Sequence, residues 1–166
     1  MRSDGRTRIV TDHDELARRI ADAQAAGRTV VWANGAFDVW HVGHTRFIEG
    51  AAAEGDVLVV GVNADASVRR NKGPDRPVHP LTERMEVVAS MRAVDWVTSF
   101  EEDTCDAMLE KLRPDVHAKG PDYTLQTLPE GQTDRRLGIR FAVVGDPKNH
   151  STTHLLRQVG RGRSAE

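Results

Sequence analysis

Two histidines, His41 and His44, lie three residues apart around Gly43 in the stretch N-G-A-F-D-V-W-H-V-G-H. A helical pattern starts directly after them, with Phe47 and Ile48 as its first apolar residues. The pair is therefore predicted to lie at a helix N-terminus, where unpaired backbone N–H groups and the helix dipole favour an anion such as phosphate. Two imidazoles at this place can donate hydrogen bonds to oxygens that gain charge during a reaction.

A zinc site is the main alternative interpretation of the two histidines. Zinc usually needs a third and a fourth ligand, and the single cysteine, Cys105, falls in a different predicted element. The spacing also differs from the H-E-x-x-H pattern of metalloprotease helices. Phosphate binding is therefore favoured over zinc binding and over two surface histidines without a role.

Two further stretches carry groups that could bind phosphate. Segment 64–80 is polar, contains Lys72 and Arg76, and is predicted to be a long functional loop. The hydroxyl cluster at 151–153 precedes another helical pattern, so it is predicted to form a second anion site at a helix N-terminus. A solvated basic surface would explain the first stretch without function, and plain N-capping would explain the second.

The elements that position these groups alternate between strands and helices. Apolar runs of strand length occur at 29–33, 56–63, 94–99, 115–119 and 139–144. Helical patterns cover 11–26, the stretch between His44 and Gly55, 81–92 with Thr82 as cap, 103–113 and 152–159. The first helix is capped by Thr11 or Asp12, and 124–138 reads as a loop with a short helix. This alternation predicts an α/β fold: one Rossmann-like, open parallel sheet of about five strands with helices on both faces.

Ligands of such sheets bind beyond the carboxyl ends of the strands. Asn34, Asn63, Lys119 and Gly145 each fall at the carboxyl end of a predicted strand, so they are expected to converge on one crevice with the histidine pair.

The pattern G-x-F-D-x-x-H-x-G-H after a strand resembles the HxGH nucleotidyltransferases, which move a nucleoside monophosphate from a triphosphate onto a phosphorylated acceptor. Four further stretches are similar to the adenylyltransferase domains of ADP-heptose synthases: V-N-A-D-A-S-V-R-R-N-K-G-P-D-R-P-V, A-V-D-W-V-T-S-F-E-E-D-T, R-P-D-V-H-A-K-G-P-D-Y and H-S-T-T. Those domains make ADP-heptose from ATP and a heptose 1-phosphate. The chain is expected to cover this half only, so that a separate kinase and phosphatase would supply the acceptor.

The resemblance implies roles for individual residues. Expected catalytic residues are His41, His44 and Lys72. Expected nucleotide-binding residues are Asn34, Gly35, Ala36, Phe37, Gly43, Lys119, Gly120, His150, Ser151, Thr152 and Thr153. Expected acceptor-binding residues are Asp38, Asn63, Asp65, Arg76 and Arg84. No protein metal site is expected, because Mg²⁺ would be held mainly by the triphosphate.

Two positions depart from the pattern of these relatives. Pro121 stands where relatives commonly have the second glycine of K-G-G-D-Y. His150 stands where relatives commonly have an arginine before S-T-T. Asp38 could orient its loop, contact the acceptor or approach Mg²⁺. Two alternatives to the heptose reaction stay open. One is a cytidylyl- or guanylyltransferase acting on glycerol phosphate or another sugar or polyol phosphate, and the other is a nucleotide-binding module without turnover.

Composition limits the remaining choices. The 166 residues are 39% hydrophobic, which predicts one domain over 29–160, preceded by an arm and covering helix over 1–28 and followed by a loose tail over 161–166. A net charge of −2 offers no bulk positive field for nucleic acid. No apolar run reaches the ~18 residues of a membrane span and no signal peptide is evident, so a cytoplasmic enzyme without membrane contact is expected. A homodimer formed through Trp96 or the 81–92 helix is an alternative to a monomer.

Overall fold

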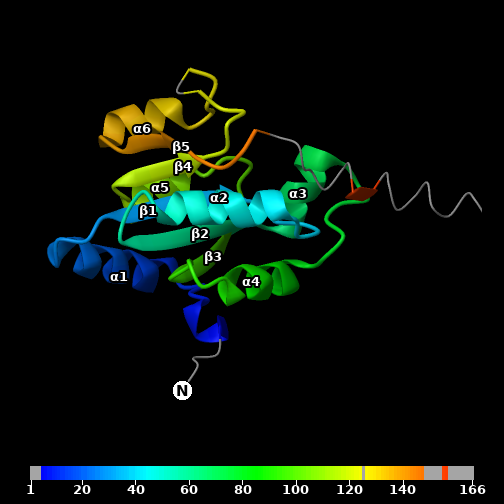
Figure 1. Cartoon of the computed structure of the whole chain (residues 1–166), viewed down its shortest axis with the longest axis horizontal. Coiled ribbons are helices and arrows are strands. Elements are labelled where there is room, and N and C mark those ends of the chain that lie inside the picture. Colours follow the sequence, from blue (N-terminus) through cyan, green and yellow to red (C-terminus); the bar gives the residue numbers. More distant parts are fainter. Residues whose placement is uncertain (1–4, 125, 148–154, 157–166) are drawn as a thin grey trace, which may run out of the picture.

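The computed structural model describes residues 5–124, 126–147 and 155–156. Within these ranges, five strands form one parallel sheet in the order β3-β2-β1-β4-β5 (Figure 1). The strands are β1 (Val30–Gly35), β2 (Val57–Asn63), β3 (Trp96–Phe100), β4 (Val116–Lys119) and β5 (Arg140–Val143). The predicted Rossmann-like sheet is confirmed.

Helices cover both faces of this sheet. The described α-helices are α1 (His13–Ala25), α2 (Val42–Ala52), α3 (Asp65–Lys72), α4 (Leu81–Ser90), α5 (Asp106–Leu112) and α6 (Gly131–Leu137). Alternate residues of β1 point to opposite faces, so Val31 packs with Ile48 of α2, whereas Val30 packs with Leu16 of α1 and Leu109 of α5. Burial on both faces explains why β1 and β2 read as unbroken apolar runs. No helix in the described ranges is both long and apolar enough to cross a membrane.

The order of the strands creates a crevice between β1 and β4. The chain runs from β1 outward through β2 to β3 and then returns to the other side of β1, where β4 and β5 lie. Ala33 pairs with Ala118, so Asn34 and Lys119 emerge next to each other at the carboxyl ends of neighbouring strands. A reversal of strand order of this kind is where open α/β sheets bind ligands.

The first ten residues differ from the expected loose arm wherever the structure describes them. Gly5–Arg8 forms a 3-10 helix, labelled η1, and Ile9 bridges to Val97 of the edge strand β3. The backbone N–H of Val10 donates to the Val97 carbonyl at 2.8 Å, and the Val10 side chain is buried. This segment covers part of an edge that would otherwise expose unpaired backbone groups. After it, Asp12 rather than Thr11 caps α1.

Segment 64–80 is not the irregular loop that its polar sequence predicted. Its first half is helix α3, and Lys72 is the last residue of that helix. Only Ser67 and Val68 of α3 are buried, so the helix shows too little apolar periodicity to be recognised from sequence. The helix therefore depends on the burial of these two residues in the folded chain, which the local sequence pattern does not predict. The next helix begins at Leu81 after Pro80, one residue before the predicted cap at Thr82.

The second half of the chain follows the prediction more closely. The ambiguous stretch 124–138 contains the short helix α6, and β5 follows it. The predicted helix over 152–159 lies outside the described residues except for 155–156, which are helical. His150 and the hydroxyl cluster at 151–153 also lie outside them.

Candidate active site

The histidine pair lies at the start of α2, as its sequence context predicted. His41 is the N-cap residue, and its Nδ1 accepts the backbone N–H of Gly43 at 3.1 Å. In the neutral imidazole the proton is therefore on Nε2, which makes that nitrogen a donor. Phe37 and Val39, in the loop before the helix, adopt positive φ values of 48° and 46°. Such conformations are costly for residues other than glycine and persist only where surrounding contacts impose them.

His44 is enclosed by aromatic rings. Its ring centroid lies 3.9 Å from that of His41, 5.5 Å from that of Phe37 and 5.2 Å from that of Trp40. Burial, followed by the positive charges of His41 and Lys72, lowers the pKa of His44 to about 3. His44 is thus a neutral imidazole near pH 7 and can donate a hydrogen bond without carrying charge. Its Nδ1 is buried with no hydrogen-bond partner among the described residues.

A cleft of about 540 Å³ opens at the carboxyl ends of the strands. Nine residues that the sequence singled out line it: Asn34, Gly35, Ala36, Phe37, His44, Asn63, Lys72, Lys119 and Gly120. The sequence did not single out the other lining residues, which are Phe47, Val68, Asn71, Asp103, Thr104, Asp122, Tyr123, Pro129 and Glu130. His41 does not line the cleft but stacks on His44, which does. Asn34, Asn63 and Lys119 thus line one cleft, as expected from their places at strand ends, whereas Gly145, which was expected to join them, is not among its lining residues.

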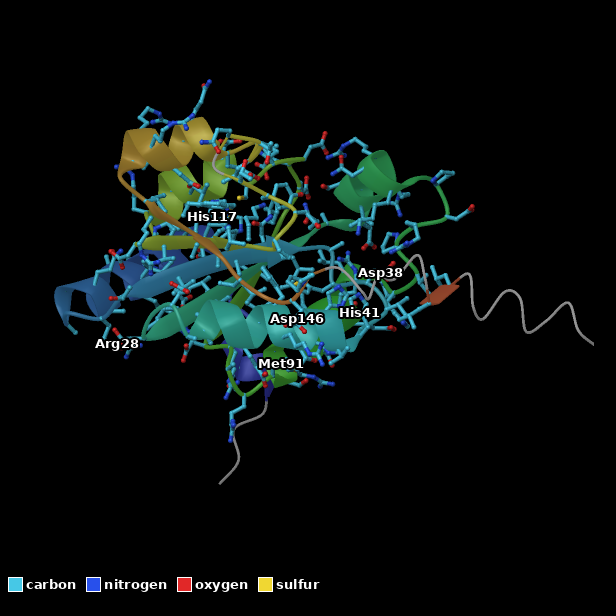
Figure 2. All side chains as sticks on the ribbon, turned by 45° about the horizontal axis from the view of Figure 1, so that its top comes forward. Arg28, Asp38, His41, Met91, His117 and Asp146 are labelled. Atoms are coloured by element: carbon cyan, nitrogen blue, oxygen red, sulfur yellow. The ribbon has the colours of Figure 1, made fainter. Side chains whose placement is uncertain are left out.

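Asp38 lies behind this cleft rather than in it. Its side chain is 1% exposed and accepts hydrogen bonds from the backbone N–H groups of Val78 and His79 and from Nε of Arg76 at 2.8 Å. Burial alone would raise the pKa of Asp38, but these donors together hold it below its ordinary value. Both oxygens of the carboxylate accept hydrogen bonds from within the protein, and these contacts tie the loop that carries Asp38 to Arg76, Val78 and His79. Figure 2 shows Asp38 and His41 at the same end of α2.

Arg84 is likewise a scaffold residue. It is 1% exposed and donates to the carbonyls of Ala36 and His79 and to Oδ1 of Asp65, the last at 2.7 Å. Three candidates for acceptor binding, Arg84, Asp65 and Arg76, do not line the cleft. Arg84 pairs with Asp65, and Arg76 pairs with Asp38. Together with Asp38 they tie the loop before α2 to α3 and to the start of α4. The loop that precedes His41 and the helix that ends at Lys72 are thus linked through Arg84.

Loss of this scaffold should be costly. We expect Asp38→Ala to lower the free energy of unfolding by ~3 kcal/mol, because it leaves Arg76 and two backbone N–H groups without their buried acceptor. Asp146→Ala is a matched control, since it breaks the exposed ion pair between Asp146 and Arg46 and should cost less than ~1 kcal/mol. Urea denaturation of both variants measures the difference. Equal losses would show that Asp38 has no special structural role.

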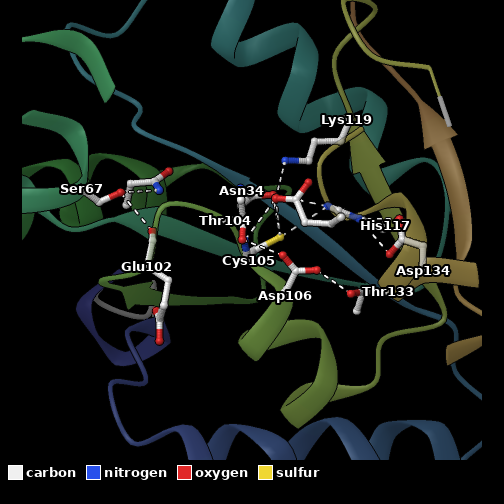
Figure 3. A network of polar contacts seen from close by, with 12 residues as sticks. Asn34, Ser67, Glu102, Thr104, Cys105, Asp106, His117, Lys119, Thr133 and Asp134 are labelled. Atoms are coloured by element: carbon white, nitrogen blue, oxygen red, sulfur yellow. Dashed lines mark hydrogen bonds and ion pairs between the residues drawn. The ribbon is translucent and has the colours of Figure 1, made fainter. Parts of the chain in front are cut away.

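Polar residues that the sequence did not single out as site residues form a network that contacts Asn34, which lines the cleft (Figure 3). His117 on β4 is fully buried, and its Nδ1 lies 2.9 Å from Oδ2 of Asp134, which accepts the hydrogen bond. Its Nε2 lies 3.4 Å from Oδ1 of Asn34 at the end of β1. Cys105 contributes its sulfur 3.5 Å from the same Asn34 oxygen. Asn34, which lines the cleft, is thus anchored from below.

Glu130 connects this network to Lys119. Its Oε1 accepts the backbone N–H of Cys105 at 3.1 Å and lies 3.6 Å from Nζ of Lys119. Burial would raise the pKa of Glu130, but Lys119 and the Cys105 N–H together lower it, so the group is a carboxylate. Burial raises the pKa of the Cys105 thiol far above its ordinary value, so the sulfur remains an S–H group rather than a nucleophile.

Sequence comparison agrees with this geometry. Residues 32–158 match the family model described as Cytidylyltransferase-like. The chain belongs to this family. This cytidylyltransferase-like domain is a nucleotidyltransferase, and the resemblance inferred from the motifs is confirmed.

Curated relatives of this cytidylyltransferase-like domain are longer proteins. It is 44% identical to the Bifunctional protein HldE of Pseudomonas paraeruginosa over 158 residues, which cover 95% of the chain and 33% of the relative. It is also 44% identical to the HldE protein of Azotobacter vinelandii over 160 residues, or 96% of the chain and 34% of the relative. The chain therefore spans about a third of the length of these relatives.

A solved structure shares the fold. The crystal structure of the lipopolysaccharide core biosynthesis protein from Thermoplasma volcanium GSS1 matches with a TM-score of 0.63 and 22% sequence identity. The match covers 74% of this chain and 100% of that one. This structural match supports the Rossmann-like architecture of the domain.

The neutral state of His44 should be visible as a pH dependence of stability. Its pKa is about 3 in the folded chain against an ordinary 6.5, so only the unfolded chain takes up this proton as the pH falls. Stability is therefore lost progressively below pH 6.5 until the pH approaches 3, and the loss attributable to His44 should reach about 2 kcal/mol at pH 5.

We expect His44→Phe to remove that part of the acid sensitivity while it keeps aromatic packing. Urea denaturation at pH 7 and pH 5 measures it, with His79→Gln as the control because the His79 side chain is half exposed. If His44→Phe loses as much stability between these pH values as the unsubstituted chain, His44 is not held neutral.

Proposed function

We propose that this domain transfers AMP from ATP to a sugar 1-phosphate, namely a heptose 1-phosphate, and releases pyrophosphate. The observation that carries the proposal is the neutral His44, stacked on His41 at the N-terminus of α2 and lining the same cleft as Lys72. The motif resemblance to ADP-heptose synthases and the similarity to HldE proteins support the choice of nucleotide and acceptor.

The histidines are proposed to act on the α-phosphate. With the triphosphate at the start of α2, the imidazoles of His41 and His44 would donate to oxygens of the α-phosphorus as it becomes five-coordinate. An oxygen of the acceptor phosphate forms the new P–O bond, the bond to the β-phosphate breaks in line, and pyrophosphate leaves with its electron pair. Neither side chain needs to give up a proton for good or form a covalent bond. Catalysis would consist of positioning and charge stabilisation.

Lys72 is proposed to hold the acceptor phosphate against the triphosphate. Two anions must approach each other in this reaction, and one ammonium group between them offsets their repulsion. Lys72 lies close enough to His44 to lower the pKa of that histidine, which fits a shared phosphate site. Its place at the C-terminal end of α3 gives the lysine a helical support.

The base and ribose are proposed to lie over β4. Lys119 and Gly120 line this part of the cleft, and Nζ of Lys119 lies 5.3 Å from the centroid of the Tyr123 ring. His150 and the cluster Ser151, Thr152 and Thr153 are proposed to contact the β- and γ-phosphates. This assignment rests on their sequence alone.

Mg²⁺ is proposed to enter with the triphosphate. No group of three or more His, Cys, Asp or Glu side chains that could hold a metal occurs among the described residues, and the carboxylate of Asp38 is already occupied. This lining suits an ion whose ligands come mainly from phosphate oxygens and water. When bound, the ion would neutralise charge on the phosphates. Because ATP is the proposed donor, the enzyme is also proposed to act in the cytoplasm.

Pyrophosphate release tests the proposed function. ATP, CTP and GTP would each be incubated with Mg²⁺ and with heptose 1-phosphate, other sugar 1-phosphates or glycerol phosphate. We expect the highest kcat/KM for ATP with heptose 1-phosphate. A preference for CTP with glycerol phosphate would support a cytidylyltransferase instead. Tight nucleotide binding without pyrophosphate from any pair would support a binding module without turnover.

A further inference from the structure

Three polar side chains in the cleft have no part in the chemistry proposed above. Asn63 is the last residue of β2, and Asp103 and Thr104 lie in the loop after β3. All three line the cleft together with Lys72. Asn63 ends β2 and Asp103 is tied to α3, on the side of the sheet away from β4, where the base is proposed to lie. Thr104 lies nearer the middle of the cleft, next to Cys105, whose sulfur contacts Asn34 on β1.

A chain of hydrogen bonds that runs through Ser67 and Glu102 (Figure 3) fixes the amide of Asn63. The hydroxyl of Ser67, which is fully buried on α3, donates its one proton to the carbonyl of Glu102 at 3.0 Å. The same hydroxyl can then only accept from Asn63, whose Nδ2 lies 3.2 Å away. The nitrogen side of the amide therefore faces Ser67. Oδ1 of Asn63 is left as an acceptor without a partner among the described residues.

Asp103 is held in a comparable way. Nε of Arg70 donates to its Oδ1 at 2.8 Å, and the same guanidinium donates to the Glu101 carbonyl at 2.7 Å. Arg70 thus clamps the carboxylate and its loop to α3. Among the described residues, the hydrogen bond and ion pair of Asp103 are both made by its Oδ1, so Oδ2 can accept hydrogen bonds from a ligand.

The hydroxyl of Thr104 is also committed as a donor. It lies 2.6 Å from Oδ2 of Asp106, and because a carboxylate accepts, Thr104 must donate. Its oxygen retains only acceptor capacity toward the cleft. Asn63, Asp103 and Thr104 thus each present an oxygen that lacks a proton to give.

A ligand that satisfies three acceptors must bring donors. A phosphate at pH 7 carries almost none and would be repelled by Asp103. Sugar hydroxyl groups donate readily, and a carboxylate and an amide oxygen are strong acceptors for them. We infer that Asn63, Asp103 and Thr104 form the site that recognises the hydroxyl groups of the acceptor, next to the lysine that holds its phosphate. The site would select polyhydroxylated phosphates over those with few hydroxyl groups.

This inference rests on the proposed function. Substitutions of two carboxylates in the same loop, Asp103 and Glu101, test it. Asp103→Asn weakens one acceptor, whereas Glu101→Gln makes the same charge change in the same loop at a residue that does not line the cleft. With ATP and heptose 1-phosphate we expect Asp103→Asn to raise the KM of the acceptor about 10-fold and to leave the KM of ATP unchanged. Glu101→Gln should match the unsubstituted enzyme. Thr104→Val should shift the acceptor KM in the same direction as Asp103→Asn.

Acceptors that lack single hydroxyl groups add a second arm. For one of a set of monodeoxy sugar 1-phosphates, kcat/KM of the unsubstituted enzyme should be about 10-fold lower than for the fully hydroxylated sugar. With that same deoxy sugar, Asp103→Asn should lower kcat/KM no further. The inference is overturned if the enzyme is active but Asp103→Asn behaves like Glu101→Gln, or if Asp103→Asn raises both KM values equally. Inactivity of the unsubstituted enzyme with every donor and acceptor would overturn the proposed function and this inference with it.

Discussion

His44→Ala should lower kcat about 100-fold to 1000-fold and change the Kd of ATP by no more than a few-fold. One neutral donor aimed at an oxyanion typically contributes ~3 kcal/mol to lowering the barrier. This interaction strengthens only as the α-phosphorus gains its fifth oxygen, so its loss should appear in turnover rather than in ground-state affinity. Steady-state pyrophosphate release gives kcat, and calorimetric titration with ATP gives the affinity.

His79→Ala is the matched control for this substitution. His79 is a half-exposed histidine that forms an ion pair with Glu83, and its side chain does not line the cleft. It should keep nearly full turnover. A His44 variant that binds ATP poorly yet turns over normally at saturation would contradict the catalytic role.

Lys72→Ala should have the second large effect. We expect the KM of the acceptor to rise and kcat to fall, with a combined loss of about 100-fold in kcat/KM, because one cation no longer offsets the repulsion between two phosphates. Steady-state kinetics with the acceptor varied at saturating ATP would measure both constants.

Arg69→Ala separates a specific role from a general loss of positive charge. Arg69 is an exposed basic residue on the same helix, three positions away, and it does not line the cleft. It should leave the acceptor KM within about twofold of its original value, as expected for a surface charge in high dielectric. Equal effects of the two substitutions would assign Lys72 to the solvated surface of α3.

Local patterns were sufficient where one element carries the signal. The run that forms β1 ends at Asn34 and Gly35, and the two histidines precede a helical period, so the end of the strand and the start of helix α2 could both be predicted from adjacent residues. Helix α3 could not, because only Ser67 and Val68 are buried and their contacts come from other parts of the chain. A polar helix with so narrow a buried face resembles a loop in sequence.

The supports of the site were also beyond local patterns. Arg84 looked like a cation available to a substrate, yet distant carbonyls and a carboxylate bury it completely. His117 forms a hydrogen bond with Asp134 on α6, and the backbone N–H of Cys105 donates to Glu130. These are tertiary contacts that residue spacing does not predict. Sequence reasoning therefore identified groups at strand ends that line the cleft and missed the residues that hold them in place.

The central claim is that His41, His44 and Lys72 gather around one polyphosphate. A crystal structure of the enzyme with a non-hydrolysable ATP analogue and Mg²⁺ tests it most directly. We expect oxygens of the α-phosphate within hydrogen-bonding distance of both imidazoles, with Lys72 facing the open side of the same phosphate. A triphosphate bound elsewhere on the molecule, with the histidine pair left without phosphate contact, would contradict the claim.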